Sequence, residues 1–135
     1  MKTILILLAL TSLGADSAQA GDDHNHEASV EAAPHGGTLR DAPPYKVELV
    51  LKGDKATLYV YDSKLKPVAL DKDTATGQLA FPKDKKKKDV TFKKAGEVYE
   101  ATLAGISKVH RYDLHINLEA QGKKVVADFG VDNIH

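Results

Sequence analysis

Hydrophobic and polar side chains alternate along the chain from Tyr45 onward, which is the pattern of strands that bury one face. The stretches with this pattern, from the clearest to the weakest, are residues 45–52, 56–62, 109–119, 124–131, 97–103, 89–93, 66–70 and 78–81. Turn residues such as Gly53-Asp54 and Gln121-Gly122 separate the strands, at the spacing of roughly 8–12 residues that is typical of all-β domains. The sequence therefore predicts an all-β fold over residues 45–135, an immunoglobulin-like antiparallel β-sandwich of about seven strands.

The same alternation predicts which side chains form the core. In residues 109–119, Tyr112, Leu114 and Ile116 share one face, while charged side chains occupy the other. No segment has the pattern of an amphipathic helix longer than a turn or two. The residues expected to be deeply buried are Val47, Leu49, Leu58, Val60, Leu114, Ile116, Val125, Ala127 and Phe129.

The first 20 residues have the organisation of a cleaved secretory signal. Lys2 supplies a positive charge, residues 4–10 are an unbroken apolar run, and Ala18-Gln19-Ala20 has the small-x-small pattern of a cleavage site. The run is too short for a membrane anchor, which needs about 20 apolar residues. We therefore expect a mature chain that begins at Gly21, has no membrane span and is periplasmic or secreted.

Residues 21–44 show no apolar periodicity. They include Pro34, Pro43 and Pro44 and the pair Gly36-Gly37. Segments that are polar and rich in proline and glycine cannot bury enough apolar surface to fold. This segment is therefore predicted to be a flexible, histidine-containing tail.

The composition limits the kinds of ligand that the chain could bind. The chain has 19 basic and 19 acidic residues, and this neutral balance argues against a nucleic-acid-binding protein. It has no cysteine, and its one methionine is Met1, which leaves with the signal. A mature chain without sulfur disfavours Cu⁺ and leaves imidazole and carboxylate as metal ligands, which suit Zn²⁺ or Cu²⁺. No organic cofactor is expected.

The densest group of donors for a metal lies in the tail. His24 and His26 are flanked by Asp22, Asp23 and Glu27, and a flexible tail can curl so that both imidazoles and a carboxylate meet one ion. The alternative is a solvated acidic tail that happens to contain two histidines. His35 precedes Gly36-Gly37 and is a further candidate ligand, although the segment also suits a plain turn into the first strand.

His110 and His115 are the remaining candidate ligands. Their spacing places them on opposite faces of the predicted strand over residues 109–119, so they could not bind one ion without a β-bulge. His110 shares the core face, where a hydrogen-bonded structural histidine is the favoured alternative. His115 shares the polar face, where simple exposure is the favoured alternative.

Two other features bear on function. Lysines dominate residues 83–88 and recur at Lys93 and Lys94; such a run is typical of a solvated loop tip, with binding of an acidic surface or anionic lipid as the alternative. Catalytic signatures are absent: the chain has no G-x-S-x-G, and His26-Glu27 fails as H-E-x-x-H because Val30 stands at the second histidine. We therefore expect no enzymatic activity.

Several short motifs together resemble a known family. They are Pro34-His35-Gly36-Gly37 with Leu39, Glu48-Leu49, Tyr59-Val60-Tyr61-Asp62, Lys66-Pro67-Val68, Val109-His110 with Tyr112-Asp113, and Gly122-Lys123. This set resembles the N-terminal β-domain of periplasmic adaptor subunits of heavy-metal efflux pumps of the resistance-nodulation-division class. The chain has no segment for the coiled-coil hairpin or the lipoyl-like domain of those adaptors, so it resembles a free-standing version of the domain.

The resemblance implies metal binding or delivery in the periplasm, with His35 and His110 as the positions that carry over. The predicted function is that of an exported protein that binds a divalent transition metal and assists metal efflux or homeostasis, with an efflux-system or other envelope protein as partner. The alternative function is a non-metal interaction module that docks an envelope protein through a sheet edge or the lysine-rich loop.

Overall fold

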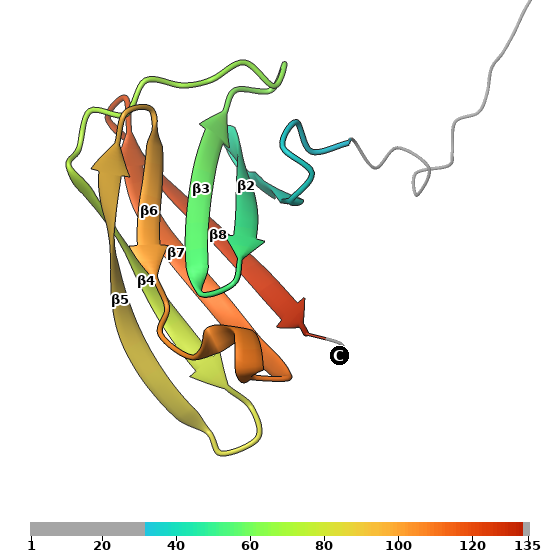
Figure 1. The fold of residues 1–135 in the computed structure, drawn as a ribbon. Coiled ribbons are helices and arrows are strands. Elements are labelled where there is room, and N and C mark those ends of the chain that lie inside the picture. Colours follow the sequence, from blue (N-terminus) through green and yellow to red (C-terminus); the bar gives the residue numbers. More distant parts are fainter. Residues whose placement is uncertain (1–31, 134–135) are drawn as a thin grey trace, which may run out of the picture. The chain divides into compact units, whose positions relative to one another are not determined.

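The computed structural model describes residues 32–133, which are built almost entirely of antiparallel strands (Figure 1). The predicted signal over residues 1–20 and the tail residues 21–31, with His24 and His26, lie outside the described residues. The strands are β1 (Thr38–Ala42), β2 (Tyr45–Lys52), β3 (Lys55–Tyr61), β4 (Thr74–Phe81), β5 (Lys86–Ala95), β6 (Val98–Thr102), β7 (Arg111–Ala120) and β8 (Lys123–Asp132).

The eight strands form one continuous sheet rather than two. Their order is β1-β2-β3-β6-β5-β4-β7-β8, and every neighbouring pair is antiparallel. The sheet curls until β1 lies beside β8, so that it nearly closes into a barrel. The all-β prediction is confirmed, but a sandwich is not, because hydrogen-bonded pairing runs unbroken from β1 to β8. The strand count is eight instead of about seven.

The eighth strand lies where the sequence predicted a tail. Residues 38–42 form β1, which pairs with β2 in the register Thr38↔Leu49 to Ala42↔Tyr45. The prediction of flexibility as far as residue 44 is therefore wrong for this segment, because β1 obtains its order from pairing with β2 and not from apolar periodicity. Pro43-Pro44, joined by a cis peptide bond, connects the two strands.

Other differences are smaller. Residues 66–70 contain no strand, only an isolated bridge between Pro67 and Tyr61. The weak pattern near residues 78–81 is the end of the longer strand β4. In residues 32–133 the one helical element is the 3-10 turn η3 (Ile106–Lys108), and no helix there is long and apolar enough to cross a membrane.

The interior of the sheet forms the hydrophobic core. All nine residues that the sequence placed there are buried, and five of them are 0% exposed: Val47, Leu58, Leu114, Ile116 and Val125. The largest additions are the fully buried aromatic residues Phe92, Tyr99 and Tyr112. The core is therefore filled by the alternate residues of the strands, as period-two patterning requires.

Candidate functional site

A carboxylate is completely buried near the N-terminal edge of the sheet. Glu48 lies in the middle of β2 with an exposed fraction of 0%, and it is the one charged side chain among the buried residues of the described chain. The alternation of β2 puts Glu48 on the face with Lys46, away from the core. Glu48 is nevertheless buried, because the segment that precedes β1 folds over the carboxylate.

Backbone amides of the covering segment bind the carboxylate. The N–H groups of His35 and Gly37 donate to Glu48 Oε2 at 3.0 and 2.8 Å. Gly36 has a positive φ of 75°, which glycine adopts without strain. At Gly37 a Cβ atom would lie 2.3 Å from the carbonyl oxygen of Leu49, so only glycine fits there. The two glycines thus allow the chain to wrap closely around a buried anion.

Two tyrosines of β3 complete the arrangement. The Tyr61 hydroxyl donates to Glu48 Oε1 at 2.7 Å and also lies 2.7 Å from His35 Nδ1. The His35 ring stacks on Tyr59 with a centroid distance of 3.8 Å and an interplanar angle of 11°. We refer to His35, Glu48, Tyr59 and Tyr61 as the Glu48 cluster.

The charge state of the cluster follows from these contacts. Burial disfavours ionisation of Glu48, but hydrogen bonds from Tyr61, Gly37 and His35 outweigh it and hold the pKa of Glu48 below its usual value. Burial and the adjacent carboxylate raise the pKa of the Tyr61 phenol. Glu48 is therefore an anion at neutral pH, and Tyr61 is a protonated donor.

The hydrogen-bond partners of His35 determine its tautomer. Tyr61 has one hydroxyl proton, which it donates to Glu48. His35 Nδ1 lies within 3.2 Å of Glu48 Oε1 as well as near Tyr61, and both of those oxygens can accept from it only if Nδ1 carries a proton. In the neutral ring the lone pair is then on Nε2, on the edge that points away from Glu48. The His35 side chain is 47% exposed, so this edge is accessible to a ligand.

The structure separates the other candidate histidines from this cluster. His110 lies in the bend before β7 and is exposed, so the prediction that it shares the core face is wrong, because the strand begins only at Arg111. His115 is on the outer face of β7, as predicted, and its Nδ1 contacts Asp128 of β8. Within residues 32–133, no three histidine or acidic side chains gather as a metal site.

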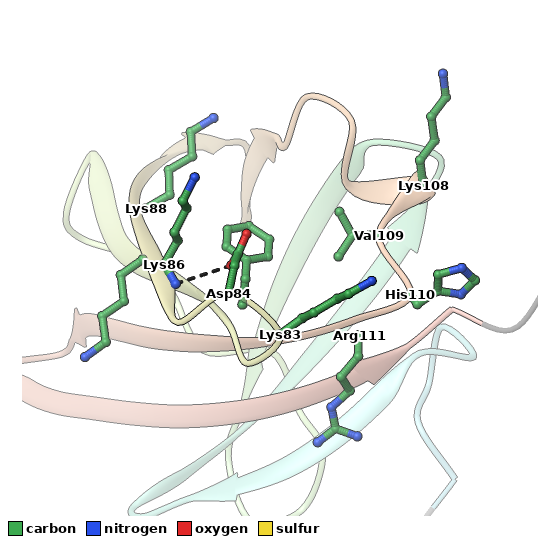
Figure 2. A pocket seen from close by; sticks show the side chains of 10 residues that line it. Lys83, Asp84, Lys86, Lys88, Lys108, Val109, His110 and Arg111 are labelled. Carbon is green, nitrogen blue, oxygen red and sulfur yellow. Dashed lines mark hydrogen bonds between the residues drawn. The ribbon is translucent and has the colours of Figure 1, made fainter.

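The lysine-rich run forms the turn and the first residues of the β4–β5 hairpin. With residues 108–111 it encloses a hollow of about 660 Å³ (Figure 2). Phe81 and Val109 provide apolar surface, and Asp84 is the one acidic residue among the lining residues. Residues 83–88 are all exposed, as expected of a solvated loop tip, although the last three belong to β5. The run also borders a concave surface, which we call the lysine hollow.

Glu48 is the member of the cluster that periodicity could not identify. The motifs that carry the family resemblance could have identified it. That set contains His35, Gly36, Gly37, Glu48 and the tyrosines of β3, and these residues lie together in the structure. His110 also belongs to the set but lies in the lysine hollow.

Comparisons with known proteins give this chain no family. No family model matches it, and neither a curated protein nor a solved structure does so. The geometry of the Glu48 cluster and of the lysine hollow therefore carries the functional argument.

Proposed function

We propose that this protein is exported to the periplasm and binds a divalent transition metal, Zn²⁺ or Cu²⁺, through histidine side chains, as an accessory to metal efflux or homeostasis. The observation that carries the proposal is the state of His35, whose Nδ1 faces Glu48 and Tyr61 while its Nε2 edge is accessible. Metal-binding histidines in proteins commonly donate the second ring N–H to a carboxylate or similar acceptor, which fixes the tautomer and increases the basicity of the ligating nitrogen.

One imidazole is not a metal site, so other donors must join His35. His26 and His24 are the histidines nearest to His35 along the chain, and they have Asp22, Asp23 and Glu27 beside them. His26 precedes His35 by nine residues (35 − 26 = 9), a length of chain that can span up to about 30 Å. We therefore propose that His24 and His26 supply most of the metal affinity of the chain, and that His35 is a further ligand.

The export proposal rests on the first 20 residues, and the link to efflux rests on the family resemblance. Two observations support extending that resemblance: its glycine pair makes the close approach to Leu49, and its glutamate is the buried anion that holds His35. These two observations give the glycine pair and the glutamate a structural role, whereas the resemblance contains them only as a sequence pattern.

Calorimetric titration of the mature chain, residues 21–135, with ZnCl₂ and CuCl₂ tests the proposal. We expect binding at neutral pH that weakens in acid, because imidazole must be unprotonated to bind a metal. The His24→Ala/His26→Ala double variant should lose most of the affinity. His35→Gln should lose at least about tenfold, because loss of a residue that only supports a metal ligand already costs about 10–100-fold.

His115→Gln is the matched control, because His115 is as exposed as His35 and also contacts a carboxylate through Nδ1. It should bind metal like the wild type. Equal affinity in the wild type and the double variant would exclude the tail as the source of ligands. Absence of binding to the wild type would contradict the proposal and favour the rival function, an interaction module without metal.

A further inference from the structure

The lysine hollow concentrates positive charge that the described protein does not neutralise. Among residues 32–133, no carboxylate forms an ion pair with Lys83, Lys86, Lys87 or Lys88. In contrast, the nearby Arg111 pairs with Asp113 and Asp132. Lysines outnumber Asp84, the one acidic residue of the lining, and concave surfaces in which one sign of charge predominates concentrate ligands of the opposite sign. The hollow is therefore suited to an anion.

Lys86 and Lys88 line the hollow because β5 extends beyond its buried part. Alternation along β5 places Lys86 and Lys88 on the same face as the buried Phe92. Their partners in β4 are Phe81 and Leu79, in the register Phe81↔Lys86 and Leu79↔Lys88. On the core-facing side of the hairpin, apolar side chains of β4 therefore lie beside lysine side chains of β5.

Cations lie on both sides of the hollow. Figure 2 shows Lys86 and Lys88 on one side, Lys108 on the other and Val109 between them, with the three lysine side chains extending in the same direction. The volume of about 660 Å³ is far more than a single small ion needs, and it falls in the range of about 300–1,000 Å³ that holds organic ligands.

A second, smaller hollow adjoins the first and has a mixed lining. It has a volume of about 240 Å³ and shares Phe81, Lys88 and Val109 with the lysine hollow. Its further lining includes the polar residues Asp89, Thr91 and Thr102 as well as apolar residues. The hydrocarbon contact for a ligand bound beside the lysines therefore comes from Phe81 and Val109 in the lysine hollow itself.

We propose that the lysine hollow binds one anionic phospholipid, with the phosphate group near Lys86, Lys88 and Lys108 and an acyl chain on Phe81 and Val109. Lysine is a common phosphate ligand in proteins, and anionic membrane surfaces attract clusters of basic side chains. An acidic peptide fits less well, because its backbone amides would lie on apolar surface without hydrogen-bond partners. This proposal does not depend on metal binding.

Calorimetry with dihexanoyl phosphatidylglycerol, used as a soluble monomer, tests the site directly on the mature chain. We expect binding that weakens with added salt, no comparable binding of dihexanoyl phosphatidylcholine, and much weaker binding of inorganic phosphate. Lys86→Gln/Lys88→Gln should weaken the interaction by about thirtyfold if each lysine contributes as it does at an anionic membrane surface. Val109→Thr, which keeps the side-chain shape, should weaken it several-fold.

Lys93→Gln/Lys94→Gln is the matched control, because it removes the same charge from the opposite end of β5. It should bind the lipid like the wild type, and thermal unfolding should show that both double variants fold. Co-sedimentation with vesicles of equal parts phosphatidylglycerol and phosphatidylcholine should depend on the same two lysines.

Three results would overturn the proposal. Equal binding of inorganic phosphate and the lipid would reduce the site to a simple anion site without a role for Phe81 and Val109. Binding to vesicles but not to the soluble lipid would indicate adsorption to a charged surface. Tighter binding of polyglutamate than of lipid, dependent on Lys86 and Lys88, would identify an acidic polypeptide as the partner.

Discussion

His35 and His115 have almost the same exposure and the same kind of neighbour, yet they lie in very different surroundings. Their side chains are 47% and 45% exposed, and each directs Nδ1 at a carboxylate. The carboxylate beside His35 is Glu48, which is 0% exposed, whereas Asp128 beside His115 is 75% exposed. Water can hydrogen-bond to Asp128 in place of His115, but it has no access to Glu48.

The contrast shows that the amides and the phenol, more than the histidine, determine how firmly each carboxylate is held. Glu48 accepts from two backbone N–H groups and from Tyr61 in addition to its contact with His35. The pair His115–Asp128 is a cross-strand contact on an open face. Surface pairs of this kind add little to stability, whereas buried anions with several donors are costly to disrupt.

The largest expected effect comes from removing each carboxylate. Glu48→Ala should lower the free energy of unfolding by about 3–5 kcal/mol, because it leaves buried N–H and O–H donors without an acceptor. Asp128→Ala should change it by less than about 1 kcal/mol. Urea unfolding followed by circular dichroism measures both, and similar losses in the two variants would contradict the comparison.

A smaller effect is expected from adding one methyl group near each carboxylate. Gly37→Ala should cost about 1–3 kcal/mol, since the new Cβ would lie 2.3 Å from the backbone oxygen of Leu49. Gly130→Ala in β8 should be neutral or slightly stabilising, because its nearest neighbour, at 3.2 Å, is the flexible end of Arg111. Thermal unfolding of the two variants distinguishes them, and a tolerated alanine at position 37 would mean that the covering loop shifts freely.

The smallest effect concerns acid. Hydrogen bonds hold the pKa of Glu48 below its usual value, so its contribution is complete above the unfolded-state pKa of about 4.3 and is lost as pH falls through the lower folded-state pKa. Glu48→Gln should therefore lose less stability than the wild type between about pH 5 and about pH 3. Asp54 and Asp62, whose pKa values are also lowered, should keep some acid dependence in the variant. Identical pH profiles would show that Glu48 does not titrate in this range.

The core could be predicted from the sequence because burial in a sheet repeats every second residue. β2, β7 and β8 carry strong alternation, and their inward residues were identified correctly. β4 was only partly found because its inward positions include Ala75 and Gly77, which give almost no hydrophobic signal. The space at Gly77 is nevertheless tight, since a Cβ would lie 3.0 Å from the Phe92 ring and would press on the core.

The candidate site was harder to predict because it depends on tertiary contacts rather than on periodicity. His35 was identified as a candidate, but nothing in the alternation of β2 distinguishes Glu48 from an exposed residue. Its burial requires the segment around Gly36 to fold back onto the outer face of the sheet. β1 was missed for the same reason, because its order comes from pairing with β2.

The order of strands in the sheet has a consequence for how the chain folds. β1 and β8 lie side by side although they are the first and last strands in sequence, and β6 pairs with β3 across the intervening β4–β5 hairpin. Contacts between residues so distant along the chain raise the contact order, which slows folding relative to proteins with local contacts. During synthesis, β1 and β8 cannot come together until the ten-residue strand β8 has been made. A growing chain, or one truncated before β8, therefore remains open along the free edge of β1.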